Sequence, residues 1–176
     1  MLESFGKALA TVPFSTTRPG VTGLVIRAVD AAQAPLEEHD LRSAPASAEG
    51  AVMLAKFHES ADCCYEARAY WDIWAPGEGG WKRGPQPLEI ICNGEEYDGG
   101  TFESAGHIQI DLGFDELFAN DEEGGSTEIE RRRENARVLY LWLRQLKSVL
   151  PVERQMLWSE TGENFEARLD AMLAQA

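Results

Sequence analysis

CYEARAYWDIW, residues 64 to 74, decides the fold, because its apolar and polar side chains alternate one by one. Alternation of this kind is typical of a β-strand with one buried and one solvated face. The expected buried face holds Tyr65, Ala67, Ala69, Trp71 and Ile73. The opposite face then carries Glu66, Arg68, Tyr70, Asp72 and Trp74. The stretch therefore predicts a long strand of an antiparallel sheet.

Segments on both sides of this strand extend the predicted sheet. GLVIRAVD, residues 23–30, reads as an earlier strand, and residues 31–50 read as a long connection rich in Ala, Pro and Ser. AVMLAKFHES, residues 51–60, is compatible with either a short helix or a strand. GHIQIDLG, residues 106–113, alternates again, with Ile108, Ile110 and Leu112 expected to point inward.

Two turns are predicted between these strands. APGEGG, residues 75–80, supplies the first, and if Ala75 faces Gly80, then Trp74 lies opposite Trp81. The next strand is expected after Pro87, at LEIIC. Asn93-Gly94 predicts a tight hairpin, because both central positions of such a turn favour a positive φ. Together these segments form an antiparallel meander.

The last third of the chain has helical periodicity. Thr127 and Glu130 fit a capping box at the start of a helix that Pro151 ends. Its apolar stripe comprises Ala136, Leu139, Leu143, Leu146 and Leu150. A final helix is expected after Gly162, with Phe165, Leu169, Met172 and Leu173 on its apolar side.

Strands followed by helices predict an α+β fold, an antiparallel meander with C-terminal helices packed on one face. The length of 176 residues fits one domain, 1–176. Residues 1–20 are compatible with an irregular N-terminal arm. The three cysteines Cys63, Cys64 and Cys92 suit reduced thiols, and the N-terminus lacks the pattern of a secretory signal, so we expect a cytoplasmic protein.

The charge balance limits the kinds of partner. Thirty acidic residues against sixteen Lys and Arg give a net charge of −14. Nucleic acid requires a clustered basic face and anionic membranes attract polybasic segments, so we predict neither as a partner. A basic protein is favoured, because opposite fields accelerate encounter.

Metal and cofactor motifs are weak. With Gly124 at the sixth position of a calcium loop, Asp121, Glu123 and Glu130 occupy ligand positions, but Ala119 stands where the first acid is needed. A solvated acidic loop explains this stretch better, with weak calcium binding left open. The histidines and cysteines have no zinc-ligand spacing. We therefore predict no cofactor and no metal site.

One pair of residues could serve an enzyme. His107 and Asp111 share the outward face of their predicted strand, and a histidine oriented by a carboxylate is an acid–base unit. A solvated polar strand face produces the same pattern without function. The pair supports a small hydrolase or transferase as an alternative, and a chaperone or adaptor for a secreted protein is a third reading.

The segment between Arg83 and Arg131 contains no lysine or arginine and thirteen aspartates and glutamates. A solvated surface, a divalent-ion site and a surface that binds a cationic protein compete to explain it. The third reading is favoured because aromatic residues are interleaved with the acids. The predicted partner-binding residues are Trp74, Tyr97, Asp98, Glu103, Asp111, Asp115, Glu116, Asp121, Glu122 and Glu123.

The acidic α+β character of the chain is accompanied by two stretches, GHIQIDLGFDELF at 106–118 and RVLYLWLRQLKSVLPVERQMLW at 137–158. In these features the chain resembles, in type, the immunity proteins of bacterial toxin systems. The resemblance implies an inhibitor that occludes the active site of a cognate, basic toxin domain acting in the cytoplasm. It implies a binding protein rather than an enzyme.

Overall fold

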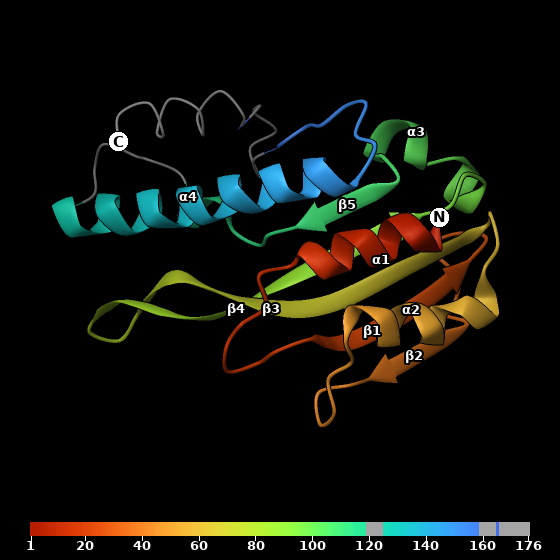
Figure 1. Ribbon diagram of the computed structural model, residues 1–176, viewed down its shortest axis with the longest axis horizontal. Coiled ribbons are helices and arrows are strands. Elements are labelled where there is room, and N and C mark those ends of the chain that lie inside the picture. Colours follow the sequence, from red (N-terminus) through yellow and green to blue (C-terminus); the bar gives the residue numbers. More distant parts are fainter. Residues whose placement is uncertain (119–124, 159–164, 166–176) are drawn as a thin grey trace.

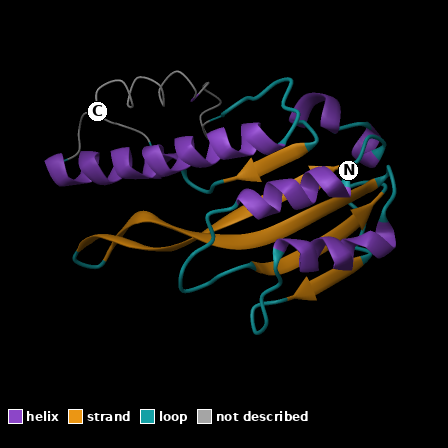
Figure 2. Cartoon of the chain, in the orientation of Figure 1, coloured by secondary structure: helices purple, strands orange, loops and turns teal. Residues whose placement is uncertain are grey.

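The computed structural model describes residues 1–118, 125–158 and Phe165. An antiparallel five-stranded sheet has the order β2-β1-β3-β4-β5 (Figures 1 and 2). The strands are β1 (Val21–Ala28), β2 (Glu37–Asp40), β3 (Cys63–Gly77), β4 (Gly80–Asn93) and β5 (Ile108–Asp111). The α-helices are α1 (Leu2–Thr11), α2 (Ala48–Ala55), α3 (Phe102–Ala105) and α4 (Ser126–Val149). Short 3₁₀ turns occupy η1 (Lys56–His58), η2 (Tyr97–Gly99) and η3 (Asp115–Leu117).

The central strand β3 confirms the alternation of CYEARAYWDIW. Its predicted inward residues are all buried, with Tyr65, Ala67 and Trp71 fully inaccessible. They form the core together with the inner side chains of β1 and β4 and with α1, α2 and α4. These three helices lie on the same side of the sheet (Figure 1). The predicted α+β class is therefore confirmed.

The first helix corrects the expected N-terminal arm. Residues 2–11 form α1, whose Phe5, Ala8 and Leu9 are fully buried against the sheet. Trp142 Nε1 of α4 donates to Thr11 Oγ1 at 3.0 Å, so a buried hydrogen bond joins the first and last described helices. The helical spacing of Leu2, Phe5 and Leu9 in LESFGKALAT is the sequence pattern that indicates this helix.

The hairpin of β3 and β4 is longer than predicted. Its turn is Glu78-Gly79, with Gly77 opposite Gly80, and β4 runs without interruption through Pro85 and Pro87. Trp74 consequently faces Arg83, and Trp81 faces Pro76, so the two tryptophans are not a cross-strand pair. The expected pairing of Ala75 with Gly80 was wrong: Ala75 faces Lys82, and the chain turns over Glu78 and Gly79, with positive φ at Gly79 and at Gly80, the first residue of β4.

Asn93-Gly94 does not form the predicted hairpin. After Asn93 the chain passes through η2 and α3 before β5 pairs with β4, with Cys92 opposite Ile108. Gly94 is needed for close packing instead, since a Cβ there would collide with the backbone oxygens of Ala61 and Cys63. Its N–H donates to the Cys63 carbonyl at 2.9 Å.

The long helix α4 ends at Val149, before Pro151, as expected. Its N-cap is Gly125, without a side-chain capping bond, so the predicted capping box of Thr127 and Glu130 is not formed. Ala136, Leu139 and Trp142 are buried, and Leu143, Leu146 and Leu150 pack against the core. Of the predicted final helix, Phe165 is buried, and Leu169, Met172 and Leu173 lie outside the described residues.

Residues 51–60, left open between helix and strand, fall in α2 and η1. Ser47 caps α2, accepting a bond from the Gly50 N–H. The expected connection over 31–50 contains the edge strand β2. No helix of the described residues is both long and apolar enough to cross a lipid bilayer.

Candidate functional site: the open face of the sheet

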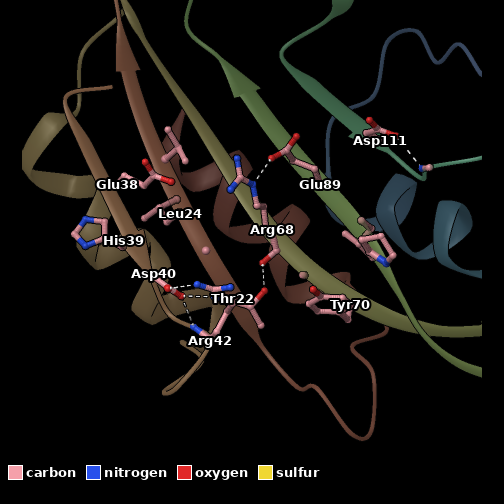
Figure 3. A pocket seen from close by; sticks show the side chains of 16 residues that line it. Thr22, Leu24, Glu38, His39, Asp40, Arg42, Arg68, Tyr70, Glu89 and Asp111 are labelled. Atoms are coloured by element: carbon pink, nitrogen blue, oxygen red, sulfur yellow. Dashed lines mark hydrogen bonds and ion pairs between the residues drawn. The ribbon is translucent and has the colours of Figure 1, made fainter. Parts of the chain in front are cut away.

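The face of the sheet opposite α1, α2 and α4 carries a groove of about 540 Å³ (Figure 3). We call it the open-face groove. All five strands contribute to it, together with the segments that follow β2 and β5. The residues that carry its chemistry are Thr22, Gly23, Glu38, Asp40, Arg42, Arg68, Tyr70, Glu89 and Asp111.

One row of residues crosses the whole sheet inside this groove. The registers place Asp40 opposite Gly23, Gly23 opposite Arg68, Arg68 opposite Glu89, and Glu89 opposite Asp111. Neighbouring strands lie about 4.8 Å apart, so the row spans roughly 19 Å. Four of its five members are charged and the fifth has no side chain. The missing side chain at Gly23 leaves the row open between Asp40 and Arg68.

A β-bulge shapes the floor beside Gly23. The register between β1 and β3 shifts between Val21, which faces Ala69, and Gly23, which faces Arg68, so Thr22 is the extra residue. Val21 remains in the core while Thr22 lines the groove, where its hydroxyl donates to the Arg68 carbonyl at 3.2 Å. Bulges re-aim side chains in this way next to functional sites.

Two ion pairs stand in the groove. Arg42 binds Asp40 at 2.6 Å, and Arg68 Nε donates to Glu89 at 3.1 Å (Figure 3). The hydrogen bonds from Arg42 lower the pKa of Asp40 to about 2. All four groups are solvent-accessible, so each pair contributes little to stability.

Glu38 and Asp111 are left in the groove without a cationic partner among the described residues. Asp111 Oδ1 instead accepts the Gly113 N–H at 2.8 Å. Because Glu89 and Asp111 face each other directly, two like charges are cross-strand neighbours, an arrangement that is destabilising. The groove therefore has an excess of negative charge beside its two internal ion pairs.

A second polar cluster adjoins the groove through His39. Glu37 on β2 lies between two imidazoles, with Nε2 of His39 at 2.9 Å and Nε2 of His58 at 3.0 Å. The hydrogen bond to His58, supported by the one to His39, lowers the pKa of Glu37. The contact between Glu37 and His58 connects the edge strand β2 to η1.

The structure places the predicted partner-binding residues that it describes on several different elements. Of these, Asp111 lines the open-face groove. Asp98, Glu103 and Glu116 are exposed on η2, α3 and η3, and Asp115 is half-buried on η3. Asp121, Glu122 and Glu123 lie outside the described residues.

The two predicted aromatic anchors are occupied within the protein. Tyr97 is 4% exposed, and burial raises its pKa to about 12. Trp74 lies under the guanidinium of Arg131, 3.8 Å from the ring centroid. Leu117 and Phe118 belong to the core, whereas Phe114 is 67% exposed.

His107 and Asp111 are not brought together. His107 precedes β5 and Asp111 is the last residue of that strand, which is roughly 10 Å long. His107 stacks on Phe102, with ring centroids 4.5 Å apart, and its Nδ1 lies 3.2 Å from the Asn93 carbonyl. The structure therefore gives these two side chains separate surroundings rather than an acid–base unit.

No group of three or more His, Cys, Asp or Glu side chains within residues 1–118 and 125–158 has the geometry to hold a metal ion. The near-miss calcium loop falls largely on residues 119–124, outside the described part of the chain. The cysteines are all buried and free.

The sequence predicted the outward face of β3, including Arg68 and Tyr70, but did not identify the groove. Gly23, Glu38, Asp40, Arg42 and Glu89 were missed. Gly23 carries a signal, because a glycine inside an apolar strand pattern indicates a bulge or a gap. The remaining four required the strand order, which local patterns do not contain.

No protein-family model matches this chain, and neither the curated proteins nor the solved structures contain a significant match.

Proposed function

We propose that this protein is an inhibitory binding domain, most simply an immunity protein that neutralises a cytoplasm-acting toxin by covering its active site. The observation that carries the proposal is the open-face groove, a solvent-accessible, negatively charged surface on a sheet whose other side is covered by helices. A two-layer fold of this kind leaves one face of its antiparallel sheet accessible to solvent, where a partner can bind.

The charge of the molecule supports a basic partner. With a net charge of −14, the protein attracts cationic surfaces over a range set by the ionic strength. A toxin domain that binds nucleic acid carries a basic surface, which an acidic surface can cover. The separate surroundings of His107 and Asp111 favour this binding role over the alternative of a small hydrolase or transferase.

The test begins with the tagged protein in a lysate of its own organism, washed at low and at high salt. We expect one stoichiometric basic protein, retained at low salt and weakened at high salt. The decisive step is functional: the isolated partner should lose its toxicity or enzymatic activity when one equivalent of this protein is added. A partner that remains fully active in the complex would contradict inhibition.

A further inference from the structure

We propose that the open-face groove is the docking site for a basic segment of the partner, and that a cationic side chain of this segment enters the gap above Gly23. This inference rests on the proposed function and adds the surface and the chemistry of recognition. The acidic segment that follows β5 then contributes to the field but is not the contact surface.

The gap at Gly23 provides the space. Gly23 is the member of the Asp40–Asp111 row that has no side chain, and its neighbours on both sides are charged. A side chain entering there meets Asp40, which Arg42 already binds through Nε and Nη2, and the methylenes of Arg68 on the other strand. The half-buried ring of Tyr70 lies one position further along the outward face of β3, with the Arg18 guanidinium over it, 4.7 Å from the ring centroid. Lysine and arginine have this combination of an apolar stem and a cationic end.

The like-charged pair Glu89 and Asp111 gives an electrostatic reason for a cation to bind in the open-face groove. These two carboxylates are direct cross-strand neighbours, and Arg68 is bonded to Glu89. A guest ammonium or guanidinium beside Asp111 relieves their repulsion and pairs with a carboxylate that has no cation among the described residues. Glu38 offers a further unpaired acid on the β2 side.

The dimensions favour an extended segment that crosses the strands. The row spans roughly 19 Å, which an extended chain covers in about six residues. Basic residues near both ends of such a segment would reach the gap above Gly23 and the Glu89–Asp111 pair together. A second copy of this chain fits less well, because two strongly acidic molecules would have to meet through acidic surfaces.

Gly23 allows a direct test. A Cβ at this position would be 3.6 Å from Cβ and Cδ of Arg68, an ordinary van der Waals distance, and valine is a favourable strand residue. Gly23→Val therefore fills the gap without a clash of the Cβ. Gly84→Val is the matched control, since Gly84 is also a strand glycine, an added Cβ there meets nothing within 4 Å, and it lies outside the groove.

The probe is nona-arginine, titrated into the isotope-labelled protein while backbone amide resonances are recorded. We expect saturable shifts concentrated in residues 22–25, 68–70, 88–89 and 111–113. Gly23→Val should weaken binding about tenfold, a loss of roughly 1.4 kcal/mol, and Gly84→Val should leave it unchanged. Asp111→Asn is the second variant, which should weaken binding without adding volume.

Shifts concentrated in residues 95–105 or 114–118, or wild-type affinity in both groove variants, would overturn the groove proposal. Such a result would leave inhibition intact if the isolated partner were still inactivated. Conversely, a partner that stays active in its complex would contradict the proposed function whatever the peptide shows. Light scattering separates a third outcome: a dimer that Gly23→Val dissociates would show that the groove is a self-association surface.

Discussion

Single residues in this core are chemically protected by burial, and the three thiols show it most clearly. Cys63, Cys64 and Cys92 are at most 3% exposed. Burial raises the pKa of Cys64 and of Cys92 to about 12, and burial also raises that of Cys63. A thiol must ionise to act as a nucleophile, so all three are unreactive at neutral pH in the folded protein.

We predict that Ellman's reagent labels none of the cysteines in the native protein at pH 8 and all three after denaturation in urea. Rapid labelling of the native protein would contradict the burial of these side chains. Slow labelling of the native protein, at the rate at which it unfolds, would instead report transient opening of the core around these cysteines.

The same thiols make stability depend on alkaline pH. An unfolded cysteine ionises near pH 8.5, whereas folded Cys64 and Cys92 keep their protons up to about pH 12. Their contribution to the free energy of unfolding is complete below about pH 8.5 and is lost as the pH rises toward 12. Urea unfolding at neutral and at alkaline pH should therefore show a falling midpoint. Cys92→Ala, compared with its own neutral-pH value, should show a shallower fall.

At the level of elements, Asn135 connects α4 to the sheet. Its Oδ1 accepts the Trp74 N–H at 2.8 Å, and its Nδ2 donates to the carbonyls of Trp74 at 2.8 Å and Leu117 at 2.9 Å. Asn135 is 1% exposed. Its amide supplies the two bonds that another strand would make to Trp74, beyond the region where β1 pairs with β3.

We predict that Asn135→Leu, which keeps the size of the side chain, lowers the free energy of unfolding by about 3 kcal/mol or more. The reason is that three backbone groups lose their partner in a place from which water is excluded. Urea unfolding followed by tryptophan fluorescence measures the loss. Arg137→Ala, an exposed change two residues along the same helix, is the control and should stay within about 0.5 kcal/mol. A comparable loss in both variants would contradict the specific role of the amide.

The elements also show what the sequence could predict. The buried face of β3 and the stripe of α4 were predicted correctly, because each follows from a local period of side chains along one element. The pairing of Trp74 with Trp81 and the hairpin at Asn93-Gly94 were wrong. In the first case a two-residue turn gives β3 and β4 another register. In the second case Gly94 allows the backbone to pack closely against residues 61–63.

The site was less predictable than the fold. Asp111 was identified as an outward residue, but its neighbours Glu89 and Arg68 come from strands whose order is set by packing across the whole domain. Likewise Trp74 looked available as an anchor until Arg131, from a helix far along the chain, was placed over its ring. The direction of a side chain is a local property of its strand, whereas its neighbours depend on the whole fold.

The whole molecule carries its net charge of −14 as a long-range field in addition to any local contact. Such fields act mainly on the rate of association and are screened by salt. The groove and the acidic segment can therefore be separated kinetically, because contact residues influence dissociation and distant charges influence association.

We predict that raising the ionic strength from about 0.01 M to 0.15 M slows association with the isolated partner about tenfold or more and changes dissociation much less. Reversing the charges of Asp121, Glu122 and Glu123 together to lysine should also slow association, with an unchanged urea midpoint. Surface plasmon resonance measures both rates. Association that is unaffected by salt and by the triple variant would contradict electrostatic attraction.

The edge strand β2 has a further consequence, which concerns colloidal behaviour. Three of its four residues, Glu37, Glu38 and Asp40, are acids, so a second β2 edge approaching in solution meets a line of like charge. Charged edges of this kind prevent aggregation by strand addition. The hydrogen bonds from Arg42 lower the pKa of Asp40 to about 2, so this carboxylate stays ionised in mild acid. We therefore expect this edge to resist pairing with a second copy of the sheet at high protein concentration.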